Sequence, residues 1–340
     1  NKSLRLRDLS LSLHLGGGAL VPGSGIEISD MDIEAGAMAW TQGVEIMADQ
    51  HGLSIPATDR TIIFSGWVEG ESGPITWHAK ALATSYLSHP NTRVSKDNFS
   101  ELAFPFSTTS VFFLDAVDAD LPNNCHAIVA FGDSLTDGTF TTLNGFDRWT
   151  DVLQRMLFSI GRTDVAVLNA GIGGNQVVSP SSIHEPWRGG PAAIERLERD
   201  VLSLSGVQTV IWLEGINDFS DNGNAELDAV KFAMTQTVHR LRAAGKRVIG
   251  ATLPSAFKST RQGHGGHVQN EKRKAFNQFI LSNGLYDTVV EIDKLLTDSN
   301  TGCLDALFDS DSTLGGPGDG LHPNRAGHAA IANEILKALT

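Results

Sequence analysis

The chain has 340 residues, of which 41% are hydrophobic and 19% charged, and its net charge at pH 7 is −13. This composition excludes a disordered polymer and a fibrous repeat. The longest apolar runs, at 127–131 and 210–213, are far shorter than the roughly 18–20 residues of a membrane helix. We therefore expect no membrane insertion.

Acidic residues exceed basic ones along the whole chain. Residues 1–124 contain 7 basic and 15 acidic side chains, and residues 125–340 contain 19 and 24. Neither part has a basic stripe, so there is no electrostatic basis for binding nucleic acid. Two cysteines, Cys125 and Cys303, are too few for a disulfide scaffold or a cysteine-only zinc site. Because we expect them at opposite ends of a sheet, we do not predict a disulfide between them.

The first 122 residues contain short apolar segments broken by glycine and proline. Between residues 4 and 15, apolar and polar residues alternate with a shift of one position after Asp8, which predicts a long strand with a bulge. Several short strands between turns predict a smaller β-sandwich or jelly-roll-like domain over 1–122. The other predicted strands span 26–33, 61–68, 75–86 and 111–117.

The polar segment 118–124 is predicted to be a linker to a second domain, 123–340. In this domain strands alternate with helices five times, which predicts an α/β fold with a parallel sheet covered on both faces. The predicted strands are 126–131, 165–169, 207–213, 246–253 and 287–292. The predicted helices are 147–160, 191–204, 225–244, 271–282 and 323–339.

Polar, glycine-bearing segments follow three of these strands and precede the last helix, where parallel sheets gather their reactive groups. They are Gly-Asp-Ser-Leu at 132–135, Asn-Ala-Gly-Ile-Gly-Gly-Asn at 169–175, Gly-Ile-Asn-Asp at 215–218 and Asp-Gly-Leu-His at 319–322. Asp133 and Asp137 are expected to fix the turn around Ser134 through hydrogen bonds to backbone N–H groups.

These segments contain the parts of a nucleophilic hydrolase. Ser134 needs a base to become nucleophilic, His322 is a candidate base, and Asp319 precedes it by one turn and can orient the imidazole. The backbone N–H groups of Ser134 and Gly174 and the side-chain amide of Asn217 are candidate donors to an oxyanion. Such a site requires neither a metal nor an organic cofactor.

The four segments resemble the four sequence blocks of the GDSL, or SGNH, hydrolase family of serine esterases. The resemblance spans residues 126–339, although the insertions at 176–190 and 255–270 are less typical. It implies a flavodoxin-like three-layer α/β/α domain with Ser134 as nucleophile, His322 as base and Asp319 as its acidic partner. It also implies that Gly174 and Asn217 form the oxyanion hole. The strand-rich first part resembles the N-terminal β-sandwich of secreted members, several of which deacetylate plant polysaccharides.

Other interpretations of these motifs are weaker. The glycines at 171–174 lack the spacing of a dinucleotide-binding loop, and the chain has no Gly-x-Ser-x-Gly nucleophile elbow. His264 and His267 could ligate a metal, but solvent-exposed loop histidines are the favoured interpretation. Three residues could contact substrate and equally could have structural roles: Asn175, Trp187 and Arg188.

The predicted substrate is a short acyl ester, such as an acetyl ester, on a small carbohydrate or a polysaccharide. The acidic chain and the lack of an amphipathic lipid-docking stretch favour it over a lipid or thioester. A lipase or lysophospholipase type of acylhydrolase is the alternative, and a non-catalytic carbohydrate-binding protein is a third. Only ten lysines and the sequon Asn98-Phe99-Ser100 are compatible with a secreted or periplasmic protein, and a cytoplasmic location stays open.

Overall fold

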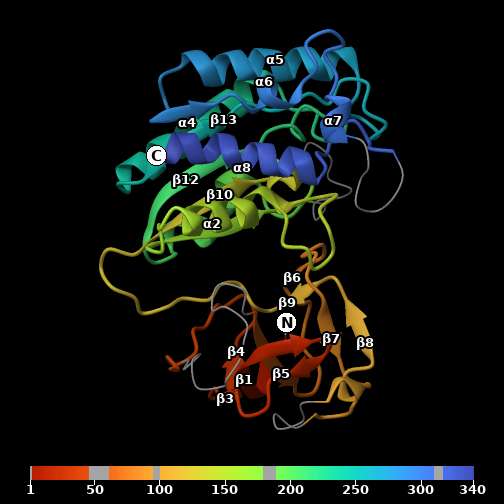
Figure 1. The fold of residues 1–340 in the computed structure, drawn as a ribbon, viewed down its shortest axis with the longest axis vertical. Helices are drawn as coiled ribbons and strands as arrows, with labels where there is room; N and C mark the ends of the chain where they lie inside the picture. The colour runs from red at the N-terminus through yellow and green to blue at the C-terminus, as the bar shows by residue number, and fades with distance from the viewer. Residues whose placement is uncertain (1, 46–60, 95–99, 179–188, 310–316) are drawn as a thin grey trace. The chain divides into compact units, whose positions relative to one another are not determined.

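The computed structural model describes residues 2–45, 61–94, 100–178, 189–309 and 317–340. The chain forms two compact units, Asn1–Asp115 and Ala116–Thr340 (Figure 1). The sequence placed this boundary at 122/123. Asn98 of the sequon and the candidate substrate residues Trp187 and Arg188 lie outside the described residues.

The first unit is built around one long strand, β1 (Leu4–Gly16), which pairs antiparallel with four shorter strands. Its strand-rich character agrees with the sequence prediction. Those four strands are β2 (Ala19–Leu20), β3 (Ile26–Glu27), β4 (Met31–Ile33) and β5 (Ile62–Val68). The described part of this unit also has two two-stranded sheets. One pairs β6 (Trp77–His78) with β9 (Val111–Phe112), and the other pairs β7 (Ser85–Leu87) with β8 (Phe106–Thr108). A short helix, η3 (Glu101–Ala103), precedes β8.

The bulge predicted in β1 is confirmed. Asp8 has a φ of 52°, and the register of β1 with β5 shifts between Arg7 and Ser10. The same bulge explains why the strand predicted at 26–33 is two strands, because β3 pairs with β1 after the bulge and β4 pairs with it before.

Two other strand predictions in this unit were too long. The segment 75–86 contains Leu82 with a φ of 51°, and the chain turns there, so that only β6 and the start of β7 are extended. Phe113 has a φ of 64° and ends β9 after two residues. A residue in the left-handed region interrupts the extended backbone unless it forms a bulge, as Asp8 does in β1, and apolar content does not reveal such a residue.

The second unit contains a five-stranded parallel sheet in the order β11-β10-β12-β13-β14. This α/β architecture confirms the predicted fold class, with the first strand of the sheet, β10, at an interior position. The strands are β10 (His126–Gly132), β11 (Val165–Gly171), β12 (Val207–Leu213), β13 (Arg247–Ala251) and β14 (Thr288–Val290).

The helices of this unit form two groups. Helices α2 and α8 pack against each other, while α4 contacts both α3 and α5 (Figure 1). Because the connections between parallel strands are right-handed, the strand order β11-β10-β12-β13-β14 places these two groups of helices on opposite faces of the sheet. The helical elements are α1 (Ser134–Asp137), α2 (Trp149–Ser159), α3 (Ala193–Leu197), η4 (Glu198–Leu202, π-helical), α4 (Leu227–Ala243), α5 (His267–Ser282), α6 (Ile292–Leu296), α7 (Ala306–Asp309) and α8 (Arg325–Leu339).

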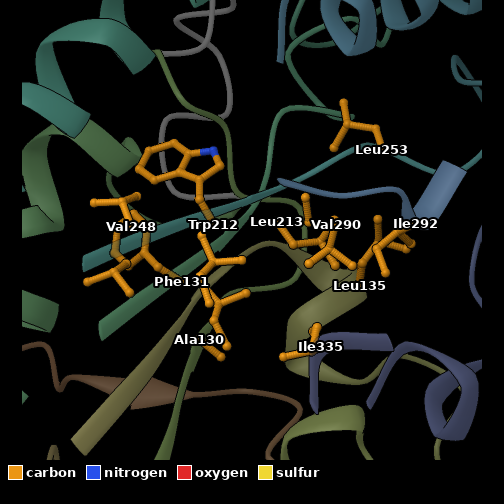
Figure 2. Packing of buried hydrophobic residues seen from close by; sticks show 14 of the residues in the cluster. Ala130, Phe131, Leu135, Trp212, Leu213, Val248, Leu253, Val290, Ile292 and Ile335 are labelled. Atoms are coloured by element: carbon orange, nitrogen blue, oxygen red, sulfur yellow. The ribbon is translucent and has the colours of Figure 1, made fainter. Parts of the chain in front are cut away.

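The core of the second unit lies where the central strands meet these helices. The rings of Phe131 and Trp212, from adjacent strands, have centroids 5.3 Å apart. Figure 2 shows these two residues with Ile335 from α8 below them. Phe131, Trp212 and Ile335 are completely buried. This packing fixes the carboxyl ends of β10 and β12. None of the helices in the described residues is long and apolar enough to cross a membrane.

Candidate active site

Ser134 lies at the carboxyl end of β10, as the first residue of α1. Asp133 caps this short helix as predicted, because its Oδ1 accepts a hydrogen bond of 2.9 Å from the Leu135 N–H. Gly132 precedes the cap, and a Cβ atom at Gly132 would clash with the backbone oxygen of Leu213. The strand therefore turns sharply into the helix, with the serine hydroxyl at the edge of the sheet.

Asp319 and His322 lie in the turn before α8. The Asp319 Oδ1 accepts the backbone N–H groups of Leu321 at 3.0 Å and His322 at 2.9 Å, and its Oδ2 lies 2.8 Å from His322 Nδ1. Burial opposes ionisation of this carboxyl, but the hydrogen bonds from His322 and Leu321 and the attraction of the imidazole outweigh it and lower the pKa of Asp319. The carboxylate therefore fixes His322 as the tautomer with a proton on Nδ1.

His322 also contacts Ser134, although 188 positions separate them in the sequence. Its Nε2 lies 2.8 Å from the Ser134 Oγ, and its ring packs edge-on against Phe140 with centroids 5.6 Å apart. With Nδ1 protonated, Nε2 presents its lone pair to the serine hydroxyl. This arrangement of hydroxyl, imidazole and carboxylate allows proton transfer from the serine when it attacks an electrophile.

Gly174 and Asn217 follow β11 and β12, the two strands that flank β10. Gly174 has a φ of 83°, in the left-handed region that favours glycine. One N–H of the Asn217 side chain donates to the Asn175 carbonyl at 2.9 Å, which leaves the second N–H for a ligand. Among the described residues, the backbone N–H groups of Ser134 and Gly174 have no hydrogen-bond partner.

The model of the GDSL-like lipase/acylhydrolase family matches residues 130–330 of this chain. The chain belongs to this family. It is therefore an ester hydrolase, and the matched residues include all four segments that the sequence analysis singled out. No curated protein matches the chain.

Several solved structures are similar to part of this chain at low sequence identity. A carbohydrate acetylesterase from Sinorhizobium meliloti is 16% identical over 63% of this chain and 98% of its own, with a TM-score of 0.48. An acetyl xylan esterase is 19% identical over 63% and 100%, with a TM-score of 0.47. A lipase/acylhydrolase from Enterococcus faecalis is 21% identical over 63% and 95%, with a TM-score of 0.46.

Beneath the site of this acylhydrolase, Arg196 of α3 connects the ends of three strands. Its guanidinium donates to the carbonyl oxygens of Gly132 at 2.9 Å and Ala170 at 2.7 Å and lies 3.3 Å from the Glu214 carboxylate. It also donates to Asn175 at 2.8 Å and Asp200 at 2.9 Å. The side chains of Arg196 and Glu214 are both fully buried. No sequence motif marks Arg196, because its partners are far apart in the chain.

Asn175, a candidate substrate residue, is part of this buried network. Its side chain is 1% exposed, and its amide donates to the carbonyls of Gly189 and of Pro191, while its oxygen accepts from Arg196. The Asn175 side chain is therefore engaged by protein groups and not by a site open to substrate. The backbone carbonyl of Asn175 accepts a hydrogen bond from the Asn217 side chain.

Three buried carboxyl groups lie near the strand ends. Burial raises the pKa of Glu214 to about 7, although the Arg196 charge opposes it, and raises that of Asp218 to about 8, although two backbone N–H groups oppose it. The Asp218 carboxyl accepts the Val177 and Val178 N–H groups at 2.8 Å and 3.0 Å. Burial also raises the pKa of Asp133 well above its usual range. These groups brace the loops around the site.

The loop between β13 and α5 contacts the site, which the sequence analysis missed. His264 was expected to be solvent-exposed, but it is half-buried, and its Nε2 lies 3.1 Å from the Asn217 Oδ1. His267 is exposed as expected and packs edge-on against Phe257. The part of the chain that the structure describes holds no cluster of three or more metal-ligating side chains. Cys125 and Cys303 are free thiols.

Proposed function

We propose that this family member hydrolyses esters through an acyl-enzyme on Ser134. The Ser134 Oγ attacks the ester carbonyl carbon while His322 Nε2 takes the hydroxyl proton. When the tetrahedral intermediate collapses, His322 returns this proton to the leaving alcohol. Water then attacks the acyl-serine, again with His322 as base, and releases the carboxylic acid. The observation that carries this proposal is the pair of 2.8 Å contacts from His322 to Ser134 and to Asp319.

The oxyanion of the intermediate would be stabilised by the N–H groups of Ser134 and Gly174 and the Asn217 side chain. Ser134 begins a helix, and the first N–H groups of a helix lack partners within it. The unengaged donors at Ser134 and Gly174 and the second N–H of Asn217 support this assignment. Losing one such donor typically costs about 100–1000-fold in turnover.

The substrate that best fits this site is a short acyl group, such as acetyl, on a carbohydrate. Ser134 is 6% exposed and His322 is 4% exposed, so an ester carbonyl must enter the site to reach the nucleophile. The net charge of −13 opposes the approach of an anionic lipid surface but not of a neutral polyol. A secreted or periplasmic location fits such a substrate.

The nucleophile is tested by treating the protein with a fluorophosphonate probe and mapping the labelled peptide by mass spectrometry. We expect labelling at Ser134, and we expect Ser134→Ala to lose both labelling and hydrolysis by about 10⁴-fold or more. Ser282→Ala, which changes an exposed helix serine, is the matched control and should hydrolyse esters like the wild type. Undiminished hydrolysis by Ser134→Ala would overturn the mechanism and favour a binding role for these residues.

The acyl preference is tested with acetyl, butyryl and octanoyl nitrophenyl esters, followed by acetylated polysaccharides. We expect the highest kcat/KM with acetyl and release of acetate from the polysaccharides. A maximum at octanoyl would contradict the short-acyl assignment and favour a lipid acylhydrolase, while leaving the role of Ser134 intact.

A further inference from the structure

We propose that His264 is a positioning residue that orients the Asn217 carboxamide toward the oxyanion. This inference rests on the proposed function, since it concerns the role given there to Asn217. It is based on the contacts of one loop, residues 252–266, which connects β13 to α5.

The Asn217 side chain is held at both ends. Its Nδ2 donates to the Asn175 carbonyl at 2.9 Å, and its Oδ1 lies 3.1 Å from His264 Nε2. Exchanging the amide nitrogen and oxygen would place Oδ1 against a carbonyl, where two acceptors repel. Only one orientation of the carboxamide satisfies Asn175, and in that orientation His264 must be the donor. The second N–H of the amide then has a fixed direction.

The imidazole of His264 lies between two acceptors. Its Nδ1 is 3.2 Å from the Gln262 carbonyl, and its Nε2 is the nitrogen that faces Asn217. Burial lowers the pKa of His264, against the opposing effect of its contact with the Gln262 carbonyl. A neutral imidazole carries one N–H and can donate to only one of these two acceptors. The tautomer protonated on Nε2 donates to Asn217 and leaves the Gln262 carbonyl without this donor.

The same loop is attached to the turn that carries Asp319. The Ser259 hydroxyl donates to the Asp319 backbone carbonyl at 2.7 Å, and the Thr260 N–H donates to it at 2.9 Å. The Arg261 guanidinium lies 3.3 Å from the Asp319 carboxylate. Residues 259–264 thus contact both the acid that orients His322 and the amide assigned to the oxyanion, so His264 is supplied by a segment already fixed to the site.

A second set of contacts keeps this loop in place from its outer side. The Asp221 N–H donates to the Gly263 carbonyl at 3.0 Å, next to His264, and the Lys258 N–H donates to the Gly265 carbonyl at 2.9 Å. Because backbone groups provide these bonds, replacing the His264 side chain leaves them intact. We therefore expect variants at this position to fold, which thermal unfolding would verify.

The test is a double-mutant cycle between His264 and Asn217, measured as kcat and KM for nitrophenyl acetate. We expect His264→Leu to lower kcat about 10-fold with KM within about 2-fold, because an amide that rotates still donates part of the time. His264→Gln, whose side-chain amide can donate to Asn217, should recover most of this loss. In the Asn217→Ala background, His264→Leu should have almost no further effect, since its target is absent. His267→Leu changes an exposed histidine in the same region that packs edge-on against Phe257, and this variant should match the wild type.

Each contrary result has a separate meaning. If His264→Leu lowers kcat equally with and without Asn217, or leaves kcat unchanged in the wild-type background, the positioning role is wrong. If Asn217→Ala itself retains full activity while Ser134→Ala is inactive, the oxyanion assignment of Asn217 fails, and this inference fails with it. A loss of labelling at Ser134 in every variant, including His267→Leu, would instead indicate general unfolding and overturn the expectation that the loop is held by its backbone.

Discussion

The two units of this protein bury polar side chains in different ways. In the described residues of the first unit, the buried polar side chains are serines: Ser10, Ser12, Ser24 and Ser110. Its arginines lie nearer the surface, where Arg7 pairs with the exposed Asp32. The second unit buries ionisable groups such as Arg196, Glu214 and His328. Buried charges require partners, so the unit that carries the chemistry is also the one that a single polar substitution damages most.

The largest effect we expect comes from Arg196→Met. This change removes the guanidinium that donates to the Gly132 and Ala170 carbonyls and to the Asn175 side chain. It also leaves the fully buried Glu214 carboxyl without its partner cation. Breaking one side of a buried ionic network typically costs about 3–5 kcal/mol. We expect the free energy of unfolding of the second unit to fall by this amount, measured by urea denaturation with circular dichroism, and hydrolysis to fall as the strand ends loosen.

Two control substitutions test whether burial of the charge causes this effect. Arg199→Met removes a half-exposed arginine three positions away, and Arg7→Met removes a partly exposed arginine of the first unit. Both should shift unfolding far less than Arg196→Met. Equal effects for the three substitutions would show that burial of charge does not distinguish the units.

A second prediction concerns the pH dependence contributed by His328 on α8. This side chain is completely buried, its Nδ1 accepts the Trp149 N–H at 3.2 Å, and burial lowers its pKa to about 4. Between pH 6.5 and 4 the unfolded chain binds a proton here that the folded chain does not, so stability falls as the pH falls. The loss attributable to His328 reaches about 3 kcal/mol at the acid end of this range.

The measurement is the difference in unfolding free energy between wild type and His328→Gln at pH 7 and at pH 4.5. Glutamine stays neutral and can accept the same N–H, so it should remove this part of the pH dependence. Glu214 and Asp218 act in the opposite direction, because their raised pKa values favour the folded state at low pH, but both are present in the two proteins and cancel in the difference. An identical pH slope for wild type and variant would contradict the prediction.

The sequence predicted the second unit well because its signals are periodic and its strand ends meet at one edge. Apolar stripes placed the sheet and its main helices, and the segments around Ser134, Gly174, Asn217 and His322 all lie at strand ends or at the start of a helix. The contact between Ser134 and His322 follows from the rule that parallel strands collect functional groups at their carboxyl ends.

What the sequence did not predict depends on tertiary contacts of irregular segments. The contact of His264 with Asn217 is formed by a loop without periodicity, so local pattern favoured an exposed histidine. Arg196 lies on a helix, and the hydrophobic pattern of that helix does not indicate that the guanidinium bonds to groups at the ends of three strands. In the first unit, single residues with positive φ, such as Leu82, ended extended segments that apolar content alone had joined.

A third prediction tests whether the first unit can be destabilised without affecting the second. Leu9 is completely buried in a small cluster in which Leu6 and Ile28 are the other fully buried members. We expect Leu9→Ala to destabilise the first unit by about 2 kcal/mol, at the low end for such changes because a small cluster can collapse around the cavity. Hydrolysis of nitrophenyl acetate should be unchanged, since the site residues all belong to the second unit.

This outcome is checked by following unfolding and activity together in one denaturant series. An earlier structural transition with activity retained through it would support independent stability of the two units. Simultaneous loss of structure and activity would show that the second unit depends on the first for its stability.

The smallest effect we predict is at the helix cap Asn324, two residues after His322. Its Oδ1 accepts the Gly327 N–H at 3.1 Å at the start of α8, and its Nδ2 donates to the Leu307 carbonyl at 3.1 Å. Asn324→Ala should cost about 1 kcal/mol, measured by urea denaturation. In the first unit, Ser100 caps a three-residue helix through a longer 3.3 Å bond, and Ser100→Ala should cost less than Asn324→Ala. If Asn324→Ala and Ser100→Ala lower the urea midpoint of unfolding by the same amount, the stabilisation from a helix cap does not depend on its burial or on helix length. The two units would then differ only in how they bury charged groups.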